Sequence, residues 1–181
     1  MQRRNKFLDF TYKYLYFHLS AKVRDIITIV KRISLQMICT EVRPEKHYIG
    51  RLPHNRDMIA SIEDFCLKTH IEMGWFSLIG AVSSVTLGYY DQKQMVYVTS
   101  KADCRLEIAS CSGNISRKDG KPFVHAHAVL TDEKGNAVGG HVFSETIIFA
   151  GEIHIQTFSG KPLDREHDHQ TGLMLWRMFH P

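Results

Sequence analysis

The segment "FVHAHAVLTDEKGNAVGGH", residues 123 to 141, decides the fold and carries the chemically most informative side chains of this chain. Two apolar runs flank the short turn sequence "DEKGN", a pattern typical of a β-hairpin. With the turn centred on Lys134, residues whose numbers sum to 268 face each other, so Leu130 faces Val138 and His127 faces His141. The sequence therefore predicts an antiparallel strand pair here.

Alternate residues of a strand share a face, so His125 and His127 point the same way, about 7 Å apart. The predicted hairpin places His141 on that face, roughly 5 Å from His127 at Cβ. A register change of one residue would send His141 to the other face, and Gly139-Gly140 is a place where a β-bulge could cause this. Three imidazoles on one face suit Zn²⁺ or another divalent transition metal. The alternative is a set of partly buried, hydrogen-bonded histidines.

One main helix is predicted before the hairpin, from about Asp57 to Thr69. Apolar residues recur there at helical spacing and would line its buried face: Met58, Ile62, Phe65 and Cys66.

Most of the remaining chain is apolar and β-branched, interrupted by turn-rich segments, and predicts strands. These strands are "WFSLIGAVSSVTLGYY", with Gly80 as a bulge, "QMVYVTS", "RLEIASCSGNIS" and "AVGGHVFSETIIFAGEIHIQTF". One helix and a run of short-looped strands favour an α+β domain with a largely antiparallel sheet. The tail is expected to pack back onto the domain, with its "EHDH" as a solvated loop.

The chain has 181 residues, 44% of them hydrophobic, which is enough for one substantial core. Its four cysteines form no C-x-x-C pair, and no cleavable signal peptide is recognised before them. We therefore expect free thiols and a cytoplasmic protein.

Charge divides the chain into a predicted extension, residues 1–36, and a domain, residues 37–181. The first part carries eight basic and two acidic side chains, a balance of +6, and the second carries fifteen and seventeen, a balance of −2. Charges interrupt the apolar run of the extension, so no transmembrane segment is predicted. The extension could be a basic amphipathic helix for anionic membranes or nucleic acid, or a disordered or loosely docked segment. The extension could also be an upstream addition to the true reading frame, because Met37 opens a stretch typical of the start of a domain.

Three motifs in order, "SLIGAVSSVTLGYY", "RLEIASCSGNIS" and "PFVHAHAVLTDEKGNAVGGHV", resemble the PPC domain, which is found in prokaryotes and in plant AT-hook proteins. The resemblance covers about residues 41–178. It implies a small domain with an antiparallel, barrel-like sheet, assembled as a homotrimer, with a metal on His125, His127 and His141. It also implies a DNA-associated role. The R-G-R-P core of the plant AT-hook is missing here, so DNA contact would fall to the basic residues 1–36.

Two functions remain open at this point. The favoured one is a non-catalytic, metal-binding trimeric module with a regulatory or DNA-associated role. The alternative is a metal-dependent, hydrolase-type enzyme with an open three-histidine site. Its candidate acid or base is Glu107, which could instead accept a ring N–H from a ligating histidine. Glu145, which strand alternation places on the face of His141, is a weaker candidate. An enzyme should show a concave pocket with a carboxylate beside the metal, whereas a regulatory module could leave the site closed at a subunit interface.

Overall fold

The computed structural model describes residues 39–177, so the predicted extension lies outside the described residues. The described part is built from one helix and nine strands. In chain order these are β1 (Arg43–Leu52), α2 (Met58–Thr69), β2 (Gly74–Asp91), β3 (Val96–Ala102), β4 (Leu106–Lys118), β5 (Lys121–Thr131), β6 (Ala137–Val142), β7 (Ile147–Ser159), β8 (Arg165–His167) and β9 (Met174–Trp176).

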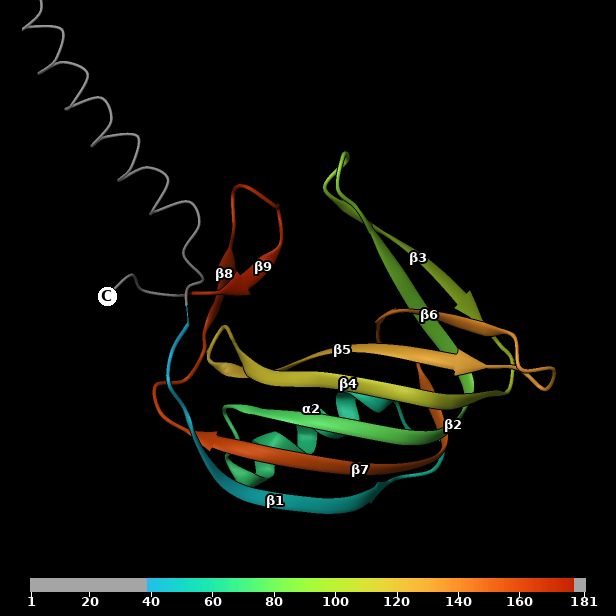
Figure 1. The fold of residues 1–181 in the computed structure, drawn as a ribbon, viewed down its shortest axis with the longest axis horizontal. Coiled ribbons are helices and arrows are strands. Elements are labelled where there is room, and N and C mark those ends of the chain that lie inside the picture. Colours follow the sequence, from blue (N-terminus) through green and yellow to red (C-terminus); the bar gives the residue numbers. More distant parts are fainter. Residues whose placement is uncertain (1–38, 178–181) are drawn as a thin grey trace, which may run out of the picture. The chain divides into compact units, whose positions relative to one another are not determined.

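The main sheet is antiparallel and runs in the order β1-β7-β2-β4-β5-β6 (Figure 1). The long strand β2 lies between β7 and β4 in its first half, and it pairs with β3 and β6 in its second half. Because β2 pairs with both β4 and β6, the strands β2, β4, β5 and β6 close a ring. The predicted α+β class with a largely antiparallel sheet is confirmed, and the ring accounts for part of the expected barrel-like shape.

The ring requires β2 to bend, and the bend falls at the predicted bulge. Pairing between β2 and β4 shifts register between Leu78 and Gly80. Gly80 has φ +142°, and a Cβ there would lie 2.1 Å from the carbonyl oxygen of Ala150. Only glycine fits this conformation and this close approach.

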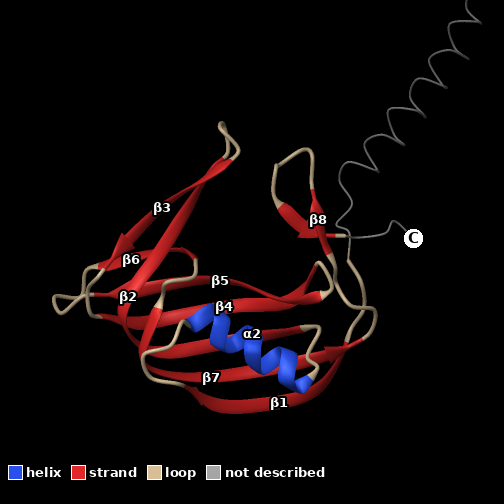
Figure 2. Cartoon of the chain, turned by 180° about the vertical axis from the view of Figure 1, so that it is seen from behind, coloured by secondary structure: helices blue, strands red, loops and turns tan. Residues whose placement is uncertain are grey.

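Helix α2 lies across one face of the sheet (Figure 2). Asp57 caps its first turn by accepting a hydrogen bond from the backbone N–H of Ala60 at 2.8 Å, and the helix ends at His70 in a left-handed conformation. The buried helix residues are Met58, Ile59, Ile62 and Cys66, whereas Phe65 is partly buried and packs against the core. The predicted helix and most of its buried face are confirmed.

The tail packs on the domain as predicted, through the β8–β9 hairpin. The N–H of Arg117 at the end of β4 donates to the carbonyl of Leu163 at 2.9 Å. The expectation of a solvated loop for "EHDH" is wrong in part, because Glu166 and His167 belong to β8, although both are exposed. Within residues 39–177, no helix has the length and apolar character needed to span a membrane.

Candidate metal centre

The β5–β6 hairpin has the predicted register. His127 pairs with His141 and Leu130 with Val138, without a bulge at Gly139-Gly140. The two glycines serve a different purpose: a Cβ at Gly139 would lie 2.7 Å from the carbonyl oxygen of Ala128, and one at Gly140 would lie 2.9 Å from that of Gly88. They therefore allow β6 to fit between β5 and β2 within the ring.

The three histidines form one cluster. His125, His127 and His141 each offer a ring nitrogen, and these atoms all lie within 4.8 Å of one another. The Nε2 atoms of His125 and His127 are 3.3 Å apart. Two nitrogens bound to one tetrahedral Zn²⁺ at its usual bond length are about 3.4 Å apart. The three side chains thus fit a late first-row divalent ion with only small ring rotations.

Burial keeps two of these rings uncharged. It lowers the pKa of His125 to about 4, with further lowering by the charges of Arg165 and His127. Burial likewise lowers the pKa of His141 to about 4, helped by the two other histidines and Arg165. A neutral imidazole is the form that binds metal, so both rings are ready as ligands near neutral pH.

Aromatic side chains hold His141 in place. Its ring lies 4.9 Å from that of Tyr97 and 4.5 Å from that of Phe143, measured between centroids. Its Nδ1 atom is 3.5 Å from the hydroxyl of Tyr97, which leaves Nε2 for a metal. Tyr97 comes from β3, an element that the sequence did not connect with the site.

The predicted carboxylates lie apart from the histidines. Glu107 is exposed and pairs with Thr131, four residues along β5 from His127, or roughly 13 Å at the usual strand rise. Glu145 follows the end of β6 with a φ of +67° and forms an ion pair with Lys101 at 3.0 Å. Its predicted alternation with His141 is wrong, because β6 stops at Val142.

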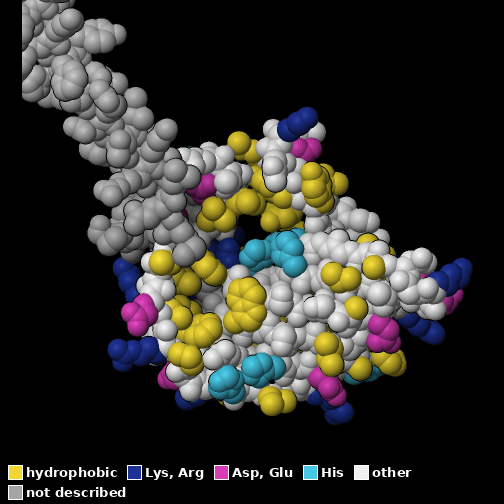
Figure 3. Space-filling view, viewed as in Figure 1, with side chains coloured by type: hydrophobic (Ala, Val, Ile, Leu, Met, Phe, Trp, Pro, Cys, Tyr) yellow, Lys and Arg dark blue, Asp and Glu magenta, His cyan; other side chains and the backbone are white. Residues whose placement is uncertain are grey.

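A cavity of about 860 Å³ opens beside the cluster, and we call it the histidine cavity. His125 and His141 line it together with five charged side chains, and two of these, Glu63 of α2 and Arg165 of β8, could not be selected from the sequence. Figure 3 shows a group of histidine side chains in a hollow bordered by hydrophobic side chains and a basic one. A concave pocket of the kind expected of an enzyme is present, and two carboxylates, Glu63 and Asp119, line it.

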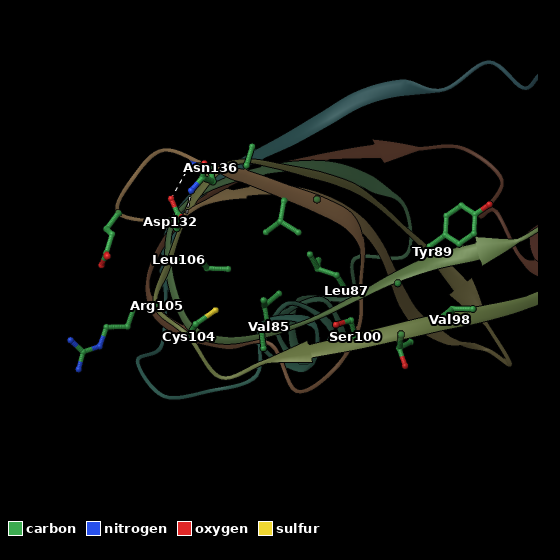
Figure 4. Close-up of a pocket in the computed structure, with 17 residues that line it drawn as sticks. Val85, Leu87, Tyr89, Val98, Ser100, Cys104, Arg105, Leu106, Asp132 and Asn136 are labelled. Carbon is green, nitrogen blue, oxygen red and sulfur yellow. Dashed lines mark hydrogen bonds between the residues drawn. The ribbon is translucent and has the colours of Figure 1, made fainter.

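A second cavity of about 860 Å³ is lined by other residues of β2, β3, β4 and β6 and by the β5–β6 turn, and we call it the leucine cavity. Val85, Leu87 and Leu106 point into it, and Asp132 and Asn136 are hydrogen-bonded to each other at its rim (Figure 4). No group of three metal-ligating side chains other than the histidine cluster occurs in the described part of the chain.

Comparison with known proteins supplies a family. The model of the Plants and Prokaryotes Conserved (PCC) domain matches residues 39–159. A comparison with curated proteins finds no match.

Solved structures give close matches over most of the chain. A metal-containing protein from Archaeoglobus fulgidus is 41% identical, with a TM-score of 0.75, and the match covers 78% of this chain and 99% of that one. A plant- and prokaryote-conserved (PPC) protein from Pyrococcus horikoshii is 31% identical, with a TM-score of 0.74, over 80% and 100% of the two chains. A protein from Ralstonia eutropha named "Putative DNA-binding protein" is 28% identical, with a TM-score of 0.65, over 72% and 90%.

Proposed function

The chain belongs to the Plants and Prokaryotes Conserved (PCC) domain family, and from this premise we propose that it binds one divalent transition-metal ion, with zinc as the expected ion. His125, His127 and His141 would hold it. The observation that carries the proposal is their convergence from two paired strands, with all three ring nitrogens within 4.8 Å. Three neutral nitrogen ligands suit zinc and leave one position for a further ligand. The metal-containing relative from Archaeoglobus fulgidus supports the assignment.

We propose further that the protein acts in the cytoplasm as a homotrimeric, non-catalytic module with a regulatory or DNA-associated role. The trimer is what the family resemblance implies. The relative from Ralstonia eutropha that is named a DNA-binding protein supports DNA association. Residues 37–181 have a net charge of −2, and phosphate contacts need clustered basic side chains. We therefore expect any DNA contact to fall to residues 1–36.

Metal analysis of the purified protein together with its solution mass tests this proposal. We expect one divalent ion per chain and a mass three times 20.9 kDa by light scattering. Metal at far less than one ion per chain after incubation with excess zinc and desalting would overturn the metal site. A monomer mass at micromolar concentration would overturn the assembly and leave the metal site standing.

A metal-dependent hydrolase remains the second candidate, and the histidine cavity is the observation that favours it. Burial raises the pKa of Glu63, which accepts a hydrogen bond from the N–H of Val124 at 3.0 Å. A carboxyl group of that kind can serve in proton transfer. If the protein is an enzyme, metal-loaded protein should hydrolyse an activated ester, and Glu63→Gln should reduce the rate far more than Glu107→Gln. Equal rates in the two variants would speak for the non-catalytic module.

A further inference from the structure

Arg165 has an unusual environment for a partly buried guanidinium. Its Nε donates to Ser116 Oγ, its Nη1 to the carbonyl of Met174 and its Nη2 to Asn114 Oδ1, each at 2.8 Å. All three acceptors are neutral, and no ion pair of Arg165 occurs among the described residues. Two of the five N–H donors, one on each Nη, have no hydrogen-bond partner in the described part of the chain.

Nearby Arg117 shows the usual arrangement. Its guanidinium contacts Asp164 through Nε at 2.8 Å and Glu72 through Nη1 at 2.9 Å, so two carboxylates balance one cation. Arg165 is held as firmly but lacks that balance. A desolvated cation is costly without a counter-charge, and this cost is reduced when an anion can bind there.

The uncompensated charge faces the histidine cluster. Asn114, which holds Nη2 of Arg165, pairs with His125 across β4 and β5, and paired residues share a face about 5 Å apart at Cβ. The guanidinium and two of the three imidazoles line the same cavity.

The rest of the histidine cavity is largely apolar. Its wall includes Tyr90, Tyr97, Phe123 and Phe143, and the guanidinium of Arg165 lies 5.0 Å from the centroid of the Phe123 ring. The other charged lining groups are Lys118, Lys121, Asp119 and Glu63. Aromatic faces stabilise a cation, but they do not neutralise it. A volume of about 860 Å³ lies in the range of pockets that enclose small organic ligands.

We propose that the histidine cavity binds a small organic carboxylate, whose two oxygens accept the two free N–H groups of Arg165 while its apolar body lies against the aromatic wall. Two parallel N–H donors match a carboxylate in a bidentate contact. The apolar wall favours such a ligand over inorganic phosphate, which would leave most of the cavity unfilled. The inference rests on the proposed function, because the metal ion supplies a second positive charge beside the carboxylate.

Benzoate and its neutral analogue benzamide are suitable probes, titrated by calorimetry into metal-free and Co²⁺-loaded full-length protein. We expect benzoate to bind the Co²⁺-loaded protein at least about tenfold more tightly than benzamide, a preference that one charge-assisted contact can supply. We also expect benzoate to shift the visible Co²⁺ absorption. Equal binding of the two probes would overturn the carboxylate site without any variant.

Variants separate Arg165 from the metal. Arg165→Gln should weaken benzoate binding about tenfold or more, while Co²⁺ stoichiometry stays at one per chain. Arg165→Lys should have an intermediate benzoate affinity, because lysine keeps the charge but lacks the two parallel N–H donors of the guanidinium. Arg51→Gln removes an exposed arginine of β1 and should change nothing. Unchanged benzoate affinity in Arg165→Gln would show that the metal alone attracts the anion and would overturn the inference.

The two proposals fail in different ways. A protein that takes up no Co²⁺ would overturn the metal site. The carboxylate site would then be tested in the metal-free protein, by comparing benzoate with benzamide in the unmodified chain and in Arg165→Gln. A protein that takes up Co²⁺ but binds benzoate and benzamide alike would overturn only the carboxylate site. Thermal unfolding of Arg165→Gln checks that its hydrogen bonds to Ser116 and Asn114 are not needed for folding. If that variant does not fold, the benzoate and benzamide titrations of the unmodified protein in its metal-free form decide, because no metal charge contributes to the preference there.

Discussion

The histidine cavity and the leucine cavity have the same volume, about 860 Å³, but only one has the composition of a binding site. The leucine cavity is lined inside by aliphatic side chains, and the polar pair Asp132 and Asn136 at its rim is already satisfied by its own hydrogen bond. The histidine cavity gathers imidazoles and a guanidinium whose charge is not neutralised within the described residues. Unsatisfied polar groups that converge, rather than empty space, mark a functional site.

The sharpest test of this difference is removal of one ligand from the histidine cluster that borders the histidine cavity. His127→Ala should abolish metal binding, because two imidazoles on a strand pair give far lower affinity than three. Metal content after zinc loading and desalting measures the effect.

His154→Ala is the matched control. His154 and His47 form a second exposed histidine pair with nitrogens 3.0 Å apart, and they lack a third ligating side chain among residues 39–177. The control should keep one ion per chain. Retention of stoichiometric metal in His127→Ala, as well as in the corresponding variants of His125 and His141, would show that the ion binds elsewhere.

Gly140 lies where β6 closes the ring against β2. A Cβ at this position would lie 2.9 Å from the carbonyl oxygen of Gly88, so Gly140→Ala must push β6 away from β2, where the ring closes. We expect lower stability by about 1–3 kcal/mol, the usual cost of such crowding, and a measurable loss of metal affinity because His141 is the next residue. Urea unfolding and a zinc competition titration give the two values. Gly50→Ala serves as the control, because nothing lies within 4 Å of a Cβ at Gly50. Gly135→Ala is unsuitable as a control, because Gly135 has a positive φ of +79° that strains any other residue.

The register of the hairpin could be predicted because every residue that sets it is local. A turn of five residues between two apolar runs fixes the pairing, and the pairing brings His141 beside His127. The bulge at Gly80 and the start of α2 near Asp57 were equally predictable, because each depends on conformational preferences of a few adjacent residues.

The remainder of the site depends on contacts between distant segments. Arg165 reaches Asn114 across 51 residues, Tyr97 reaches His141 across 44, and Glu63 reaches Val124 across 61. No periodicity or spacing connects such segments. The mistaken placement of Glu145 has a different cause, because alternation was extended past Val142, where the strand ends.

A smaller effect is expected from truncation within the leucine cavity. Leu106→Ala removes a buried side chain next to existing empty space and should lower the free energy of unfolding by about 2–3 kcal/mol, the lower part of the usual range for this change. Metal content and benzoate affinity should remain unchanged, because Leu106 lines the leucine cavity and not the histidine cavity. Urea unfolding and metal analysis of one preparation test both statements. Loss of metal in Leu106→Ala would mean that the two cavities are energetically coupled.

Removal of the first 36 residues should have the smallest effect on either cavity. Every side chain that lines them lies between residues 59 and 175, and the buried core between Leu52 and Ile155 is complete without the extension. A chain beginning at Met37 should therefore keep its thermal unfolding temperature and its metal. It should lose any salt-sensitive affinity for duplex DNA, because the +6 balance is removed and −2 remains. Thermal unfolding, metal analysis and DNA titrations at low and moderate salt compare the two chains. Unfolding or metal loss in the shorter chain would place the extension within the core, and full retention of DNA affinity would show that the folded domain itself binds DNA despite its charge.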